Sequence, residues 1–176
     1  MAQLMGTIRQ DQNKAFENQV VTVLTQAGMP VTAPSVKQIA GHRLVSGSGA
    51  DLGDIDAIAL DPASKIIIIA EAKDSELART PAELSNEATD LVTGGKSAAA
   101  KLSRRTDWVQ GNMALVLRHF KVPGSQAGWR VLPVIVTSRN LVSPRVIEAS
   151  IPVVALTELQ AWVAKNRRSP ARQRRR

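Results

Sequence analysis

The stretch Gly53-Asp-Ile-Asp-Ala-Ile-Ala-Leu-Asp-Pro-Ala-Ser-Lys-Ile-Ile-Ile-Ile-Ala-Glu-Ala-Lys73 decides the fold. Its two apolar runs are separated by Asp-Pro-Ala-Ser, which predicts two strands joined by a hairpin turn. The second run, at residues 66–70, is uninterrupted and largely β-branched. Such a run is typical of a central strand that is buried on both faces, and it is too short for a buried helix.

Charged residues gather at one end of this strand pair. Side chains alternate across a strand, so Glu71 and Lys73 should point to one face and Ala72 to the other. If the strands are neighbours, the start of the first lies beside the end of the second, which brings Asp56, and alternatively Asp54, close to Glu71. Two carboxylates and an ammonium group meeting there predict a metal site. A salt bridge between Glu71 and Lys73 is the alternative, but an exposed pair is worth only ~0–1 kcal/mol and would not explain the additional acids.

Length and composition indicate one globular domain. The chain has 176 residues, of which 44% are hydrophobic, and we expect residues 1–165 to fold and residues 166–176 to form a disordered basic tail. The absence of cysteine excludes disulfides and thiolate metal sites. No signal-peptide pattern and no apolar run of ~18 residues is present, so we expect a cytoplasmic protein without a membrane partner.

The net charge of +8 is unevenly distributed along the chain. Residues 1–95 carry seven basic and twelve acidic side chains, residues 96–164 nine and three, and residues 165–176 seven and none. An acidic cleft beside a basic surface would suit a phosphodiester substrate. The alternative for the middle segment is that its basic residues only solvate helix faces.

The order of the predicted elements indicates an α/β fold, a three-layer sandwich with a mixed central sheet flanked by helices. We expect helices at 8–27, 80–92, 96–120 and after 156, and strands at 53–61, 66–73, 131–137 and 151–156. Residues 31–45 should contain one further strand, with 38–45 as the best candidate. Glu17 lies at the margin of the apolar stripe of the first helix. It could face the sheet edge that carries Asp56 and Glu71, or it could be an ordinary boundary carboxylate.

Two groups of basic residues are candidates for binding nucleic acid. Lys101 and Arg105, one turn apart and predicted to lie off the apolar stripe of their helix, could contact phosphate, with a solvated face as the alternative. The tail would bind a phosphate backbone without sequence preference, through Arg167, Arg168, Arg172, Arg174, Arg175 and Arg176.

The arrangement of acids around the strand pair resembles the PD-(D/E)XK nuclease superfamily, which has the restriction-endonuclease-like fold. The likeness rests on a helix with an inward glutamate, then Gly-Asp-Ile-Asp at 53–56, a turn, and an apolar strand ending in Glu-Ala-Lys at 71–73. By motif it covers roughly residues 8–75. The proline that the superfamily places before the aspartate is missing.

The resemblance implies a metal-dependent nuclease that hydrolyses the phosphodiester bonds of DNA, in repair, recombination or defence. Asp56 and Glu71 would hold Mg²⁺, with Mn²⁺ as an alternative ion, Lys73 would be the motif lysine, and Glu17 the accessory acid. The chemistry is consistent with these residue types, because Mg²⁺ held by one or two carboxylates keeps waters that become better nucleophiles. The backbone carbonyl of Ala72 could add a further ligand.

Three alternatives remain open at this point. The chain could be a catalytically inactive nucleic-acid-binding module of the same fold. RNA could replace DNA as the partner. A homodimer would be the simplest arrangement for paired cuts in two strands.

Overall fold

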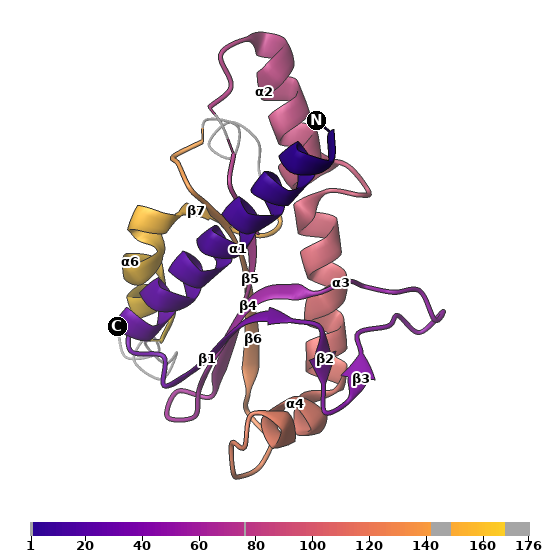
Figure 1. Ribbon diagram of the computed structural model, residues 1–176. Helices are drawn as coiled ribbons and strands as arrows, with labels where there is room; N and C mark the ends of the chain where they lie inside the picture. Colours follow the sequence, from indigo (N-terminus) through magenta and orange to yellow (C-terminus); the bar gives the residue numbers. More distant parts are fainter. Residues whose placement is uncertain (1, 76, 142–148, 168–176) are drawn as a thin grey trace.

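A five-stranded mixed sheet forms the centre of the computed structural model of the chain (Figure 1). The structure describes the backbone of residues 2–75, 77–141 and 149–167, and the side chains from residue 11 onward. In spatial order the strands are β1 (Val31–Val36), β4 (Ile55–Asp61), β5 (Ile66–Lys73), β6 (Arg130–Thr137) and β7 (Val153–Ala155). Neighbours among β1, β4 and β5 are antiparallel, whereas β5, β6 and β7 are parallel. The predicted α/β class with a mixed sheet is therefore confirmed.

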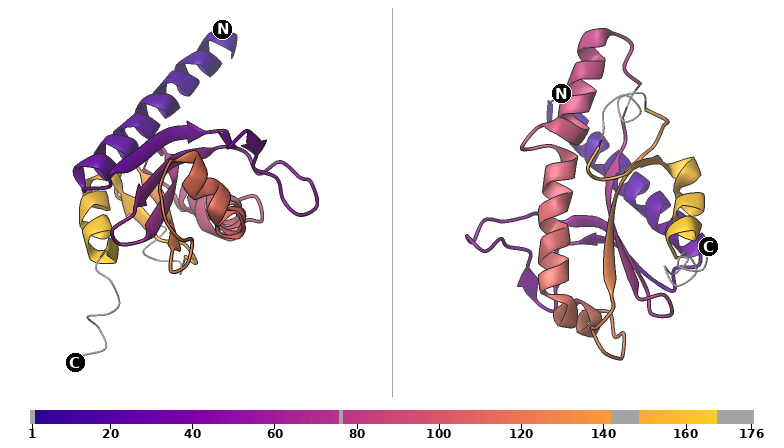
Figure 2. Two further views of the ribbon diagram at one scale, coloured as in Figure 1. Left: turned by 90° about the horizontal axis from the view of Figure 1, so that it is seen from below. Right: turned by 180° about the vertical axis from the view of Figure 1, so that it is seen from behind.

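Helices cover both faces of this sheet (Figure 2). The elements outside the sheet are α1 (Ala2–Gln26), β2 (Gln38–Ile39), β3 (His42–Arg43), α2 (Pro81–Ala88), the π-helical turn η1 (Thr89–Thr93), α3 (Ala98–Gly111), α4 (Met113–His119) and α6 (Leu156–Arg167). Helices α1 and α6 pack on one face, and α3 and α4 on the other. Helix α2 extends beyond the sheet at the end where β5 finishes (Figure 1).

The run of isoleucines in β5 is buried on both faces, as predicted. Ile66 and Ile68 belong to the layer beneath α1 and α6, and Ile67 and Ile69 to the layer beneath α3 and α4. All four are fully buried. Because successive side chains of a strand alternate between faces, one uninterrupted apolar run supplies both layers of the core.

The chain before β4 differs from the prediction. The strand expected within residues 31–45 is present as β1, which is the sheet partner of β4, but its preferred position at 38–45 was wrong. Those residues form only the small hairpin of β2 and β3. Pro34 cannot donate a ladder hydrogen bond, and Ser35 has a positive φ of 46°. Both features obscure a strand in the sequence, and both are tolerated here because β1 lies at the edge of the sheet.

The predicted helices are largely confirmed, with one interruption. The helix that follows β5 starts with a capping box, in which Thr80 and Glu83 satisfy each other's backbone N–H groups and Pro81 takes the first helical position. The helix predicted over 96–120 is divided into α3 and α4 at Asn112. The Asn112 side chain donates a hydrogen bond to the carbonyl of Trp108, 2.8 Å away, which ends the first helix locally.

The end of α1 is joined to the end of α6 by Arg167. Gly28, at a φ of +84°, ends α1 in a Schellman motif, because its N–H binds the carbonyl of Thr25 at 2.9 Å and the next N–H binds that of Leu24 at 3.2 Å. The Arg167 guanidinium donates to the carbonyl of Ala27 at 2.9 Å and pairs with Asp61 at 2.8 Å.

Arg167 is therefore a folded residue, and its assignment to a disordered tail was wrong. It lies in α6, and it connects that helix to α1 and to the turn after β4. The other tail residues predicted to bind nucleic acid, Arg168, Arg172, Arg174, Arg175 and Arg176, lie outside the described residues.

Candidate functional site

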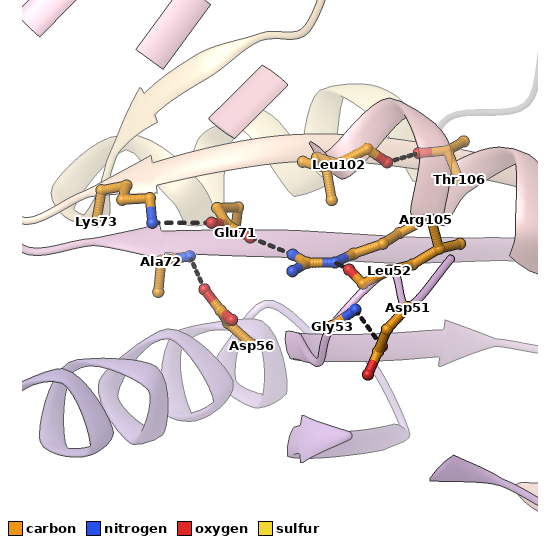
Figure 3. A network of polar contacts seen from close by, with 10 residues as sticks. All are labelled: Asp51, Leu52, Gly53, Asp56, Glu71, Ala72, Lys73, Leu102, Arg105 and Thr106. Atoms are coloured by element: carbon orange, nitrogen blue, oxygen red, sulfur yellow. Dashed lines mark hydrogen bonds and ion pairs between the residues drawn. The ribbon is translucent and has the colours of Figure 1, made fainter. Parts of the chain in front are cut away.

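The register of β4 and β5 brings Asp56 beside the end of β5 (Figure 3). Ala57 pairs with Ala70 in the antiparallel ladder, which places Asp56 across from the residues that follow Ala70. The Asp56 carboxylate accepts a hydrogen bond from the backbone N–H of Ala72 at 2.8 Å. A side chain thus continues the pairing of the two strands by one further contact.

The Ala72 backbone faces the same gap. On the opposite edge of β5, the carbonyl of Lys73 accepts a hydrogen bond from Ser138 N–H at 3.2 Å. Because the backbone groups of successive residues point to alternate edges of a strand, both the N–H and the carbonyl of Ala72 are directed toward β4. The carbonyl predicted as a metal ligand is therefore on the side of Asp56.

Glu71 lies between two cationic side chains. The residue is only 4% exposed. One carboxylate oxygen is 2.8 Å from the ammonium of Lys73, and the other binds the guanidinium of Arg105. The salt bridge between Glu71 and Lys73 that the sequence offered as the alternative is therefore present, but its Glu71 side is buried, whereas the Lys73 side chain is 38% exposed. Removing one partner of a buried ion pair leaves an uncompensated charge, which typically costs ~3–5 kcal/mol.

Arg105 was predicted to lie on the exposed face of its helix, and this is wrong. It is 7% exposed, and its Nε–H also donates to the carbonyl of Leu52 at 2.9 Å. The sequence contains a signal for this placement, because Arg105 is three residues after Leu102 and four before Val109 on the apolar stripe of α3. A cationic side chain on such a stripe is buried only where an anionic partner such as Glu71 compensates its charge.

Asp56 is in an unfavourable environment for a negative charge. Burial, and next the charge of Glu71, raise the pKa of Asp56 from 3.8 to about 7. The charge of Glu17 acts in the same direction, whereas the Ala72 N–H and Lys73 lower the pKa. Glu17 reaches this region from α1, where its carboxylate accepts a hydrogen bond from the Ser35 hydroxyl.

The structure distinguishes the two aspartates that the sequence left as alternatives. Asp54 is exposed and lies 3.8 Å from the ammonium of Lys37, which is exposed as well. Asp56 instead binds the Ala72 backbone and interacts with Glu71, Glu17 and Lys73. The group at the end of β5 therefore includes Asp56, and Asp54 belongs to the surface.

A cavity of about 610 Å³ adjoins the group on the Lys73 side. Its lining comes from Lys73, the loop after β5, α2, η1 and the first turns of α3. The cationic lining residues are Lys73, Arg79, Lys96 and Lys101, and the acidic ones are Glu83, Glu87 and Asp90. Lys101 is exposed, as predicted. It lines the same cavity as Lys73, whose ammonium also contacts Glu71.

The oxygen donors at the end of β5 are too few for a closed protein cage around a metal. Within residues 11–75, 77–141 and 149–167, no group of three or more Asp, Glu, His or Cys side chains is arranged to hold a metal. Asp56, Glu71 and the Ala72 carbonyl offer hard oxygen ligands from two carboxylates and one backbone group. Mg²⁺ is commonly held by one or two carboxylates while it keeps several waters, so these residues fit that ion.

In the part of the chain that the structure describes, no helix has the length and apolar character needed to cross a bilayer.

Comparisons with other proteins give no assignment. No protein-family model matches the sequence, and neither the curated proteins nor the solved structures include a significant match.

Proposed function

We propose that the chain is a metal-dependent nuclease that hydrolyses phosphodiester bonds of DNA, with a restriction-endonuclease-like fold of the PD-(D/E)XK superfamily. The observation that carries this proposal is the grouping of Asp56, Glu71 and Lys73 at one end of β5, where burial and Glu71 raise the pKa of Asp56 to about 7. A carboxylate in that environment gains more from a bound cation than a solvated carboxylate does.

In the proposed reaction, some residues would bind the metal and others would act on the water and the phosphate. A divalent ion held by Asp56, Glu71 and the Ala72 carbonyl would supply Lewis-acid chemistry and a water of lowered pKa. Lys73, whose ammonium is 2.8 Å from Glu71, would orient the attacking water and stabilise the charge that develops on the phosphate oxygens. Glu17 would add negative charge from α1.

The cavity beside Lys73 supports a substrate with phosphate groups. Lys96 and Lys101 lie on its wall together with Lys73, so phosphates next to the scissile one would meet ammonium groups just before and within the first turn of α3. Contacts of this kind bind the backbone and carry no sequence information. RNA would satisfy them too, and DNA is the substrate that the proposal names.

The experiment is cleavage of supercoiled plasmid in Mg²⁺ or Mn²⁺ by wild type, Asp56→Asn, Glu71→Gln and Lys73→Met. The loss of one preorganised electrostatic group typically lowers the rate ~10²–10³-fold. Asp54→Asn is the matched control, because it removes a carboxylate two residues away that faces the surface. Equal rates in all variants would refute the proposed site.

A second function is favoured by one observation. Both oxygens of Glu71 are already bound by cations, Lys73 and Arg105, so the buried carboxylate is charge-compensated without a metal. This would suit a nucleic-acid-binding module that keeps the fold and does not cut. Retention of an oligonucleotide by wild type, with no cleavage in any divalent metal, would select this function over the first.

A further inference from the structure

Arg105 is a buried cation that the proposed chemistry does not use. It projects from the middle of α3, where its Nη1 binds Oε2 of Glu71 and its Nε binds the carbonyl of Leu52 at 2.9 Å (Figure 3). One guanidinium thereby joins the end of β5 to the turn that leads into β4. The end of β5 supplies Glu71 and the Ala72 carbonyl to the proposed metal site, and the turn leads directly into the strand that supplies Asp56.

The turn before β4 is shaped around this guanidinium. Gly53 has a φ of +72°, and a Cβ atom at this position would lie 3.0 Å from Nη2 of Arg105. A side chain at residue 53 would therefore push the guanidinium away as well as strain the backbone. The inward position of Arg105 is built into the fold by Leu52 and Gly53.

Arg105 occupies an oxygen that the proposed metal would also need. The charged groups of the site are the carboxylates of Glu17, Asp56 and Glu71 and the cations of Lys73 and Arg105. When all three carboxylates are ionised, they leave with the two cations a formal charge of −1, which a divalent ion would overcompensate. A phosphate of the substrate restores negative charge, and Mg²⁺ sites commonly complete their coordination with substrate phosphates.

We propose that Arg105 is a positioning residue that acts through Glu71. It holds the Glu71 carboxylate in place in the metal-free protein and opposes the binding of a divalent cation until a nucleic-acid phosphate joins the site. This inference rests on the proposed nuclease function. It gives Arg105 a role in the order of binding, in place of the direct contact with phosphate predicted from the sequence.

The test is calorimetric titration of the full chain with Mn²⁺, using wild type, Arg105→Gln, Arg105→Lys and Arg104→Gln. Repulsion between a divalent ion and one nearby cation predicts that Arg105→Gln binds Mn²⁺ at least about tenfold more tightly than wild type. Arg105→Lys, which keeps the charge, should stay within about twofold of wild type by the same reasoning. Arg104→Gln, which changes the same charge on an exposed neighbouring residue, should do so too.

Bound duplex should tighten Mn²⁺ binding to wild type, as the Arg105→Gln substitution does. The duplex phosphate offsets the repulsion between Arg105 and the metal, and the two ligands strengthen each other's binding reciprocally. In Arg105→Gln this repulsion is already absent, so a phosphorothioate duplex, which resists hydrolysis, is expected to tighten Mn²⁺ binding less than in wild type. A merely structural role for Arg105 would lower the thermal stability of Arg105→Gln without tightening its metal binding. Equal or weaker Mn²⁺ binding by folded Arg105→Gln would overturn the inference and leave the nuclease proposal standing.

A measurement on wild type alone covers the case in which Arg105→Gln does not fold. The side-chain Nε–H resonance of Arg105, assigned by its disappearance in Arg105→Lys, should shift when Mg²⁺ saturates the protein in the presence of the duplex. A resonance that stays in place while Mg²⁺ binds would overturn the role of Arg105. Failure of wild type to bind Mn²⁺ or Mg²⁺ even with duplex present would overturn both this inference and the metal-dependent function.

Discussion

Asp56→Asn is expected to make the metal-free protein more stable at alkaline pH. Asparagine keeps an oxygen that can accept the hydrogen bond from the Ala72 N–H, which the carboxylate accepts at 2.8 Å. It carries no charge, so it no longer suffers from burial or from the repulsion of Glu71 and Glu17. The substitution therefore removes an unfavourable charge while it preserves the local packing.

The magnitude follows from the pKa of Asp56, which rises from 3.8 to about 7 in the folded protein. One pKa unit corresponds to ~1.36 kcal/mol, so the full penalty for the ionised side chain is about 4 kcal/mol. Relaxation of the fold and penetration of water around the buried charge reduce this penalty, and we expect a gain of ~1–3 kcal/mol. In a chain of this length, that gain raises Tm by roughly 3–10 °C.

The dependence on pH has a definite sign. Between pH 3.8 and about 7, Asp56 is protonated in the folded chain and ionised in the unfolded chain. The folded state then binds more protons, so the contribution of this group to stability falls as the pH rises through that window. Below the window the two states are equally protonated, and above it the penalty is complete.

The assay is urea denaturation of wild type, Asp56→Asn and Asp54→Asn in a chelator, at pH values from 4 to 8. The advantage of Asp56→Asn over wild type should be small at pH 4 and largest at pH 8, while Asp54→Asn should show no such trend. Added Mg²⁺ should narrow the gap, because ligand at 100 times its Kd stabilises the folded state by ~2.7 kcal/mol. A gap that is absent or independent of pH would refute the reasoning.

Three further predictions concern other parts of the molecule. Arg167→Ala should lower the free energy of unfolding by ~1–3 kcal/mol in urea at pH 7. Although burial opposes it, the Ser64 hydroxyl and Arg167 lower the pKa of Asp61 from 3.8, so this contribution should be complete above that pH and disappear as the pH falls through the folded pKa. Gly53→Ala should cost roughly 1–2 kcal/mol by the same assay, since its φ is +72°; an unchanged midpoint would contradict this. Lys101→Gln should make the slope of log K for duplex binding against log salt concentration shallower by ~0.9, as measured by fluorescence anisotropy. An unchanged slope would show that Lys101 does not contact phosphate.

The central strands and the start of α2 could be predicted from the sequence because each depends on a few consecutive residues. The isoleucine run of β5 and the capping box at Thr80 each depend on a few consecutive residues, and the structure has both where they were expected. The strand pair also predicted that Asp56 would lie beside the end of β5, because the turn at 62–65 leaves little choice of register.

The differences arise where a distant partner decides the outcome. Arg105 is buried because Glu71, 34 residues away, accepts its guanidinium, and Arg167 is held in α6 by contacts with Asp61 and Ala27. The sequence analysis predicted that both arginines are exposed to solvent or contact phosphate. The helical spacing of Arg105 indicates that it faces the core, but nothing local in the sequence names the partner of either arginine, because contacts between elements depend on how the helices pack against the sheet.

The central claim is that Asp56 and Glu71 form one oxygen site for a divalent cation at the end of β5. A crystal structure of wild type grown with Mn²⁺ and a short duplex, with data collected at the manganese absorption edge, tests it most directly. The predicted result is an anomalous peak bound by the two carboxylates and the Ala72 carbonyl. A fully occupied Mn²⁺ elsewhere, with Glu71 still bound only to Lys73 and Arg105, would contradict it.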